Sequence, residues 1–289
     1  MIRIITDSTN DLDKETLEKH NVMVLPLYVN FSDASYKDGV DITTPELYKL
    51  VSEKKELPKT AAIPMQTFIT VFQEIVDQGD EVIFTGISKQ MSKTYENAVL
   101  ASREVNEEKI FVVDSMNLST GIGLLVLKAC KYRDEGKTAK EIALLLNQDN
   151  KRVLSQFAIE TMEYLHKGGR CSSLAKIFGT LLKIKPMIAV RDGKMHVAKK
   201  PHGKMQVALD IMIEQIKKDL PRLDPDMVIV THSLAFESND YIRSRLSEFL
   251  GDIPILSTVA GCVISSHCGQ GTIGILYMVK DEHNDVNEA

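Results

Sequence analysis

Short apolar runs alternate along the chain with longer stretches whose apolar residues recur at helical spacing. The runs are rich in β-branched residues, which favours strands, and they cover residues 2–5, 22–29, 82–84, 110–113, 156–159, 187–190, 227–230 and 254–256. The intervening stretches predict helices over residues 11–19, 45–54, 66–78, 93–105, 119–135, 138–151, 161–166, 173–183, 204–219 and 238–250. Strands that alternate with helices are typical of an α/β protein with mainly parallel sheets covered by helices.

A polar stretch near the middle of the chain marks a candidate domain boundary. Residues 144–157, LLLNQDNKRVLSQF, end a predicted helix in polar residues before a new strand begins. We therefore expect two α/β domains, residues 1–150 and 151–289, each large enough to bury its own core.

The composition is that of a soluble globular protein, with 44% hydrophobic and 26% charged residues among 289. No apolar run approaches the roughly 18 residues that cross a bilayer, and the chain begins with a strand-like run that leaves no room for a signal peptide. A cytoplasmic protein without membrane insertion is expected.

None of the four cysteines lies in a CxxC pair, and Cys262, His267 and Cys268 are too few for a metal site, which needs about four ligands. We expect no metal.

Hydroxyl side chains follow three of the predicted strands. The exits read TDSTNDL after residues 2–5, TGISKQMSKT after residues 82–84 and DSMNLSTGIG after residues 110–113. In an open parallel sheet, the carboxyl ends of the strands line the binding crevice.

Any one of these hydroxyl or carboxylate residues could instead be an ordinary helix N-cap, and this is the interpretation we adopt for Asp11 and for one of Ser8 or Thr9. Ser92 and Thr94 lie two residues apart and offer more hydroxyls than one cap uses. Helix N-termini with adjacent hydroxyls bind small anions, so the second exit predicts an anion site.

Motifs of nucleotide, hydrolase and zinc enzymes give little support to a cofactor. The chain contains no GxxxxGK[ST], GxSxG or HExxH sequence. Gly269, Gly271 and Gly274 form a GxGxxG sequence, but it lies near the end of the chain, whereas a dinucleotide-binding fold has this motif at its start. We expect neither ATP, NAD nor zinc as a cofactor.

Positive charge gathers between His166 and Lys204. Ten Lys or Arg residues stand there against one acid, in a chain whose net charge is −5. This pattern indicates a docking surface for an anionic ligand, an acidic partner or nucleic acid, although a solvated basic face would need no function. The same region holds an apolar segment over residues 174–190. We expect four of its residues to lie in the core or to line an apolar channel: Ile177, Phe178, Leu181 and Leu182.

Seven motifs, in order along the chain, resemble those of the DegV family of bacterial fatty-acid-binding proteins. They are TDSTNDL, PKTAAIP, MSKTYENA, DSMNLSTGIG, LHKGGRCSS, LLKIKPMIAVRDGKM and HCGQGTIG, and they span about residues 2–280. The resemblance implies a two-domain α/β protein that buries one long-chain fatty acid, such as palmitate, between its domains. It also implies a partner, a separate fatty acid kinase that brings ATP and converts the presented carboxylate to acyl phosphate for phospholipid synthesis.

The resemblance further implies that Thr60, Ser92 and His267 bind the carboxylate. Arg170, in KGGR, resembles the family's basic residue near the ligand mouth and is suited to contact with phosphate or the kinase. Thr94, Ser119 and Gly269 are also expected near the ligand or the kinase contact. The chain departs from the family pattern at Ala61, Ala62 and Lys93, which bears on chain-length preference and kinase docking.

Two other functions stay open at this point. A lipid hydrolase could use a Ser/His pair, but it would need an acid such as Asp7 or Asp114 to orient His267. A nucleic-acid-binding regulator could use the basic stretch over residues 166–204. We favour the fatty acid carrier, without nucleic acid, without catalysis of its own and as a monomer.

Overall fold

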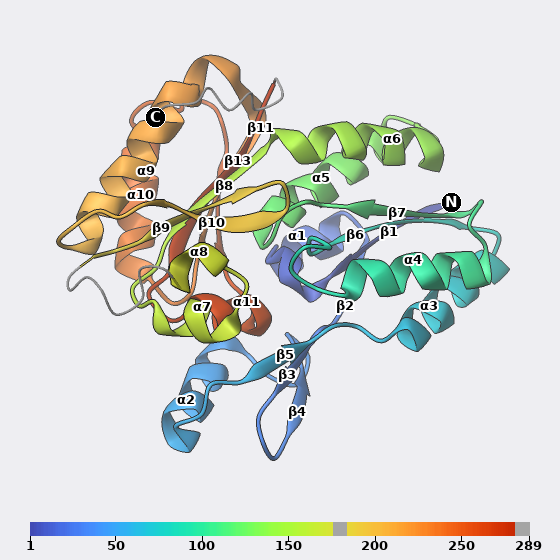
Figure 1. Cartoon of the computed structure of the whole chain (residues 1–289). Helices are drawn as coiled ribbons and strands as arrows, with labels where there is room; N and C mark the ends of the chain where they lie inside the picture. The colour runs from blue at the N-terminus through green and yellow to red at the C-terminus, as the bar shows by residue number, and fades with distance from the viewer. Residues whose placement is uncertain (176–183, 281–289) are drawn as a thin grey trace.

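The computed structural model describes residues 1–175 and 184–280, which form an α/β protein with two main sheets (Figure 1). The described strands are β1 (Ile2–Asp7), β2 (Val22–Leu25), β3 (Tyr28–Asn30), β4 (Ser35–Lys37), β5 (Lys59–Ala61), β6 (Glu81–Gly86), β7 (Ile110–Asp114), β8 (Val153–Ala158), β9 (Met187–Arg191), β10 (Lys194–Lys199), β11 (Leu223–His232), β12 (Ile255–Val259) and β13 (Ile273–Val279). The described helices are α1 (Lys14–Lys19), α2 (Thr44–Lys54), α3 (Met65–Asp77), α4 (Thr94–Val105), α5 (Thr120–Asp134), α6 (Ala139–Asp149), α7 (Glu163–Gly168), α8 (Ser172–Ala175), α9 (Met205–Asp219), α10 (Phe236–Ser247) and α11 (Cys262–Cys268). The predicted α/β class is confirmed.

The first sheet is parallel, with the strand order β2-β1-β6-β7. Its central strand β6 is apolar at consecutive positions, and Val82, Ile83 and Phe84 are all fully buried. Consecutive burial follows because helices cover both faces of the sheet: α3 and α4 pack on one face, α5 and α6 on the other. The parallel pairing predicted from the sequence holds for this sheet.

The second sheet is mixed, with the order β10-β9-β8-β13-β11-β12. Among its described pairs only β11 and β12 run parallel, and the others are antiparallel. The expectation of mainly parallel strands is therefore wrong here. One local cause is the connection between β9 and β10, where Asp192 and Gly193 both have positive φ angles. An Asp-Gly pair in this conformation closes a tight hairpin and leaves no helix between the strands.

Helix α5 joins the two sheets, since it contacts β1 and β6 of the parallel sheet and β8, β11 and β13 of the mixed sheet. One buried cluster accordingly includes Ile4 and Ile83 from the first sheet with Phe157 and Ile188 from the second. The strands of the parallel sheet all precede residue 115 and those of the mixed sheet follow residue 152. A domain boundary at residue 150 stays a prediction.

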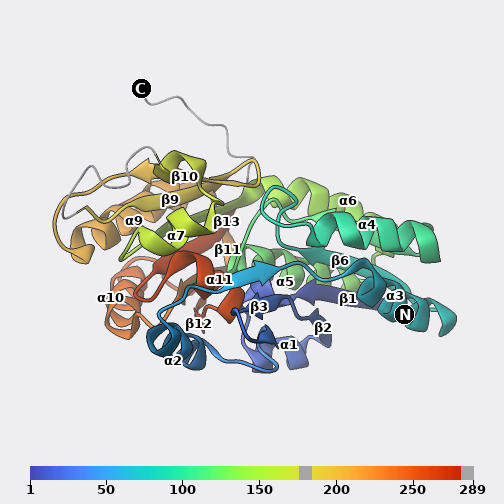
Figure 2. The same cartoon turned by 60° about the horizontal axis from the view of Figure 1, so that its bottom comes forward.

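A small antiparallel sheet, β4-β3-β5, lies beside the short helix α11 (Figure 2). Residues from the first quarter of the chain therefore meet residues from its last tenth. Within the described ranges, no helix combines the length and apolar character needed to span a bilayer.

Candidate functional site

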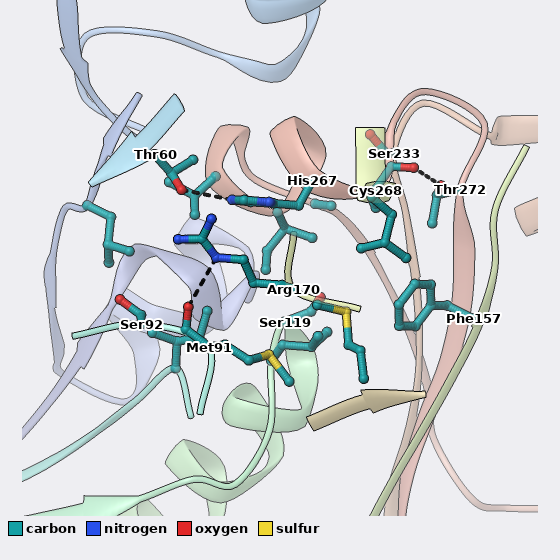
Figure 3. A pocket seen from close by; sticks show the side chains of 18 of the residues that line it. Thr60, Met91, Ser92, Ser119, Phe157, Arg170, Ser233, His267, Cys268 and Thr272 are labelled. Atoms are coloured by element: carbon teal, nitrogen blue, oxygen red, sulfur yellow. Dashed lines mark hydrogen bonds between the residues drawn. The ribbon is translucent and has the colours of Figure 1, made fainter. Parts of the chain in front are cut away.

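A cavity of about 180 Å³ lies between the two main sheets. One wall comes from the loops that follow β6 and β7, and the other from β8, β13 and helices α7 and α11. The walls are mostly apolar and include Ile87, Met91, Leu118, Phe157, Met195 and Leu276. Thr60, Ser92, Arg170 and His267 lie together at one end (Figure 3). An apolar cavity with a few convergent polar groups is the usual form of a small-molecule site.

Thr60, Ser92 and His267 all line this cavity. Thr60 lies on β5 and His267 on α11, and their Oγ1 and Nε2 atoms are 2.8 Å apart across 207 residues of sequence. Ser92 lies just before α4, where its Oγ accepts from the Thr94 backbone N–H at 3.2 Å and lies 3.0 Å from the Thr94 hydroxyl. The structure thus brings the three predicted carboxylate ligands to one cavity, with a direct hydrogen bond between Thr60 and His267.

The environment of His267 keeps its imidazole neutral. Burial, and after it the positive charge of Arg170, lower the pKa of His267 to about 4. The ring therefore carries no charge near pH 7, and it acts on an anion only through a hydrogen bond.

The unpaired nitrogen of this ring indicates its tautomer. Nδ1 is buried and has no hydrogen-bond partner among the described residues, and a Cβ on Gly168 would lie only 2.4 Å from it. A bare acceptor is tolerated in such a place more readily than a bare N–H, so we infer that the proton is on Nε2. Nε2–H then donates to Thr60 Oγ1, and the Thr60 hydroxyl is left to donate into the cavity.

Arg170 supplies the positive charge at the same end of the cavity. Its Nη1 donates to Gly168 O at 2.7 Å, and its Nε to Met91 O at 3.5 Å. Figure 3 shows its side chain between the Thr60–His267 pair and Ser92. Within residues 1–175 and 184–280 Arg170 makes no ion pair at 4.0 Å or less, so its charge is available to an anionic ligand.

Ser119 connects the cavity to buried carboxylates. It lines the cavity, has a φ of 52° and places its Oγ 2.5 Å from Asp11 Oδ2. Asp11 Oδ1 accepts from the Gly261 N–H at 2.8 Å, and Asp38 accepts from the Cys262 N–H at 2.7 Å. The side chains of Asp11 and Asp38 therefore hold the N-terminus of α11, the helix that carries His267.

Burial raises the pKa of Asp11 to about 8 and that of Asp7 to about 6. Sequence reasoning missed this role for Asp11. The expected N-cap function is wrong, since Asp13 caps α1 by accepting from the Thr16 N–H. No local signal links Asp11 to Gly261, because 250 residues separate them.

The remaining predicted residues fall into three groups. Thr94 is the buried first residue of α4 and supports Ser92 from outside the cavity lining. Gly269 ends α11 with a φ of 81°, and a Cβ there would come within 2.9 Å of Tyr164. The predicted tail-lining residues lie outside the described residues: Ile177, Phe178, Leu181 and Leu182.

The geometry gives no support to a hydrolase at this site. Within residues 1–175 and 184–280, no carboxylate orients His267, because its Nδ1 has no hydrogen-bond partner there. The Ser92 hydroxyl contacts Thr94, and the His267 Nε2 contacts Thr60. A serine nucleophile needs both a hydrogen bond to the base and an oriented base, and neither is present among these residues.

Known proteins resemble the chain over almost its whole length. A family model described as "Uncharacterised protein, DegV family" matches residues 1–280. A DegV domain-containing protein of Clostridium acetobutylicum is 33% identical over 282 residues, which cover 96% of this chain and 99% of the relative.

Two solved structures have a similar fold. The fatty acid binding DegV family protein of Thermus thermophilus matches with a TM-score of 0.89 and 29% identity, covering 96% of this chain and 99% of that one. DegV of Bacillus subtilis, described as a fatty acid binding protein, matches with a TM-score of 0.86 and 26% identity over the same shares.

Proposed function

Because the chain belongs to the DegV family, we propose that it binds one long-chain fatty acid in the cavity between its two main sheets. The carboxylate lies at the polar end, where Thr60 and Ser92 donate hydrogen bonds and Arg170 supplies the positive charge. The single observation that carries this proposal is the Thr60–His267 pair beside Arg170 at one end of an otherwise apolar cavity.

Physical chemistry accounts for both parts of such a ligand. An anion in a partly buried site is strongly disfavoured unless donors or charges compensate it, and the two hydroxyls and the guanidinium provide this compensation. His267 acts through Thr60 by fixing the direction of its hydroxyl group. For the tail, each buried methylene contributes about 0.8 kcal/mol, so a palmitoyl chain could contribute on the order of 10 kcal/mol before the costs of association.

The likeness to solved proteins supports the same assignment. The relatives from Thermus thermophilus and Bacillus subtilis are fatty acid binding proteins, and a relative from Eubacterium ventriosum with a TM-score of 0.85 and 27% identity binds stearic acid. Thr60, Ser92 and His267 lie in three of the motifs that resemble those of the family, PKTAAIP, MSKTYENA and HCGQGTIG, and this agrees with a carboxylate site.

Extraction of the purified protein tests the proposal directly. Organic extraction followed by mass spectrometry should release a long-chain fatty acid, and added palmitate should raise the melting temperature of the delipidated protein. A ligand at a hundred times its Kd stabilises the native state by about 2.7 kcal/mol. A protein that yields no acyl chain and shows no thermal shift with palmitate would refute the proposal, and co-purified nucleic acid would favour the regulator instead.

We further propose that the protein presents the carboxylate to a separate kinase. The polar end of the cavity includes Lys93, whose side chain is 76% exposed, so this end lies close to solvent. Incubated alone with ATP, Mg²⁺ and palmitate, the protein should form no acyl phosphate, and addition of a fatty acid kinase should produce it. Product without the kinase would refute this division of labour.

A further inference from the structure

The cavity has two chemically different ends. Thr60, Ser92 and Arg170 lie together at one end, and Phe157 lies at the other end with Ser233 and Thr272 nearby (Figure 3). A fatty acid whose carboxylate occupies the first end must direct its methyl terminus towards the second. This inference therefore rests on the proposed function and concerns what limits the tail.

The position of Phe157 is fixed by the mixed sheet. The residue lies on β8, directly opposite Gly274 of β13 and Ile188 of β9, and its side chain is buried. A Cβ on Gly274 would come within 2.9 Å of both Phe157 Cβ and Gln156 O. Because Gly274 has no side chain, β13 can lie this close to β8 beside Phe157.

The hydroxyl groups at this end are already satisfied by protein partners. Ser233 Oγ lies 2.7 Å from Ser265 Oγ and 2.5 Å from the Tyr48 hydroxyl. Thr272 Oγ1 donates to Cys268 O at 2.8 Å. Because these groups are paired, they offer little to a polar ligand group, and the aromatic ring is the large apolar surface that a methyl terminus can contact.

We propose that Phe157 closes the tail end of the cavity and so sets the longest acyl chain that the protein binds well. A chain that reaches the ring has its terminal methyl in contact with it. A longer chain must leave methylenes in solvent or displace the carboxylate from Thr60 and Ser92, and its affinity falls.

The test compares wild type with Phe157→Leu and Phe157→Ala. Calorimetry with delipidated protein would give the affinities for myristate, palmitate, stearate and arachidate. In wild type the affinity should rise along the series and then fall. In both variants the maximum should move to a longer acid, with a gain of about fourfold for each methylene newly accommodated.

Phe72→Leu provides a matched control, because Phe72 is fully buried on α3 in a different core cluster and does not line the cavity. It should lower the melting temperature without moving the affinity maximum. A maximum at the same acid in wild type and in both Phe157 variants would overturn the inference.

A crystal structure of the wild-type protein with its longest well-bound acid covers the case in which the variants do not fold. The terminal methyl should lie within about 4.5 Å of the Phe157 ring, and a methyl placed elsewhere would overturn the inference. Failure of the wild type to bind any of the four acids would instead refute the proposed function.

Discussion

Replacing Thr60 by valine removes one hydroxyl and keeps the shape of the side chain, so it isolates the hydrogen bond at the centre of the site. In the ligand-free protein this change leaves both ring nitrogens of His267 without a hydrogen-bond partner in the part of the chain that the structure describes, since Nδ1 has none there already. An unsatisfied buried polar group costs about 1–3 kcal/mol, and the free energy of unfolding should fall by this amount.

Ligand binding should be affected as well. A hydrogen bond to a charged group contributes roughly 1.5–3 kcal/mol, so the affinity for palmitate should fall by roughly ten- to 150-fold. Thr60→Ser retains a hydroxyl and should stay within about threefold of wild type, a difference below 1 kcal/mol.

Calorimetric titration of delipidated protein with palmitate, together with urea unfolding, measures both effects. Thr70→Val is the matched control, because Thr70 is exposed on α3 and its hydroxyl donates only to Gln66 O of the preceding turn. A Thr60→Val protein that binds palmitate as tightly as wild type would refute the role assigned to the Thr60 hydroxyl.

Three further predictions follow from the charges around the site. Burial raises the pKa of Asp11 from 3.8 to about 8, so between these pH values the native state keeps a proton that the unfolded chain has lost. The free energy of unfolding therefore falls as pH rises through this range, by up to about 1.4 kcal/mol per pH unit. Urea unfolding at several pH values should show that the free energy of unfolding of Asp11→Asn depends less steeply on pH. The pKa of His267 is lowered from 6.5 to about 4, so its contribution to stability is lost as pH falls from 6.5 through 4, and the same measurement on His267→Asn should lack this loss. Arg170→Gln should raise the pKa of His267, as followed by NMR titration, and should weaken palmitate binding more at low salt than at high salt.

The parts of the fold that periodicity encodes were predictable. Strands β1, β6 and β7 and the helices around them combine apolar runs with helical spacing, and the parallel sheet follows from their alternation. The mixed sheet was not predicted, because its antiparallel strands pair across long stretches of sequence, and a local residue pattern does not show which strands become neighbours. Its central strand β13 is buried at every position, and such a strand shows no alternation of polar and apolar residues for a pattern to detect.

The site was predictable only in part. Ser92 stands out by its local hydroxyl cluster, whereas Thr60 and His267 entered through motif resemblance. Residue patterns reveal partners a few positions apart, but the Thr60–His267 contact spans 207 residues. Phe157 lies in none of the seven motifs. Its place at the end of the cavity depends on the pairing of β8 with β13, which a local pattern does not show.

The anchoring of α11 has a consequence for the order in which the protein is made. Asp38 accepts a hydrogen bond from the Cys262 N–H, 224 residues further along the chain. A ribosome that adds about 5–20 residues per second needs roughly 11–45 s to synthesise that many residues. The parallel sheet, complete by residue 114, can form during this time while Asp11 and Asp38 stay hydrated. We therefore expect a nascent chain to acquire its lipid only after His267 has left the ribosomal tunnel.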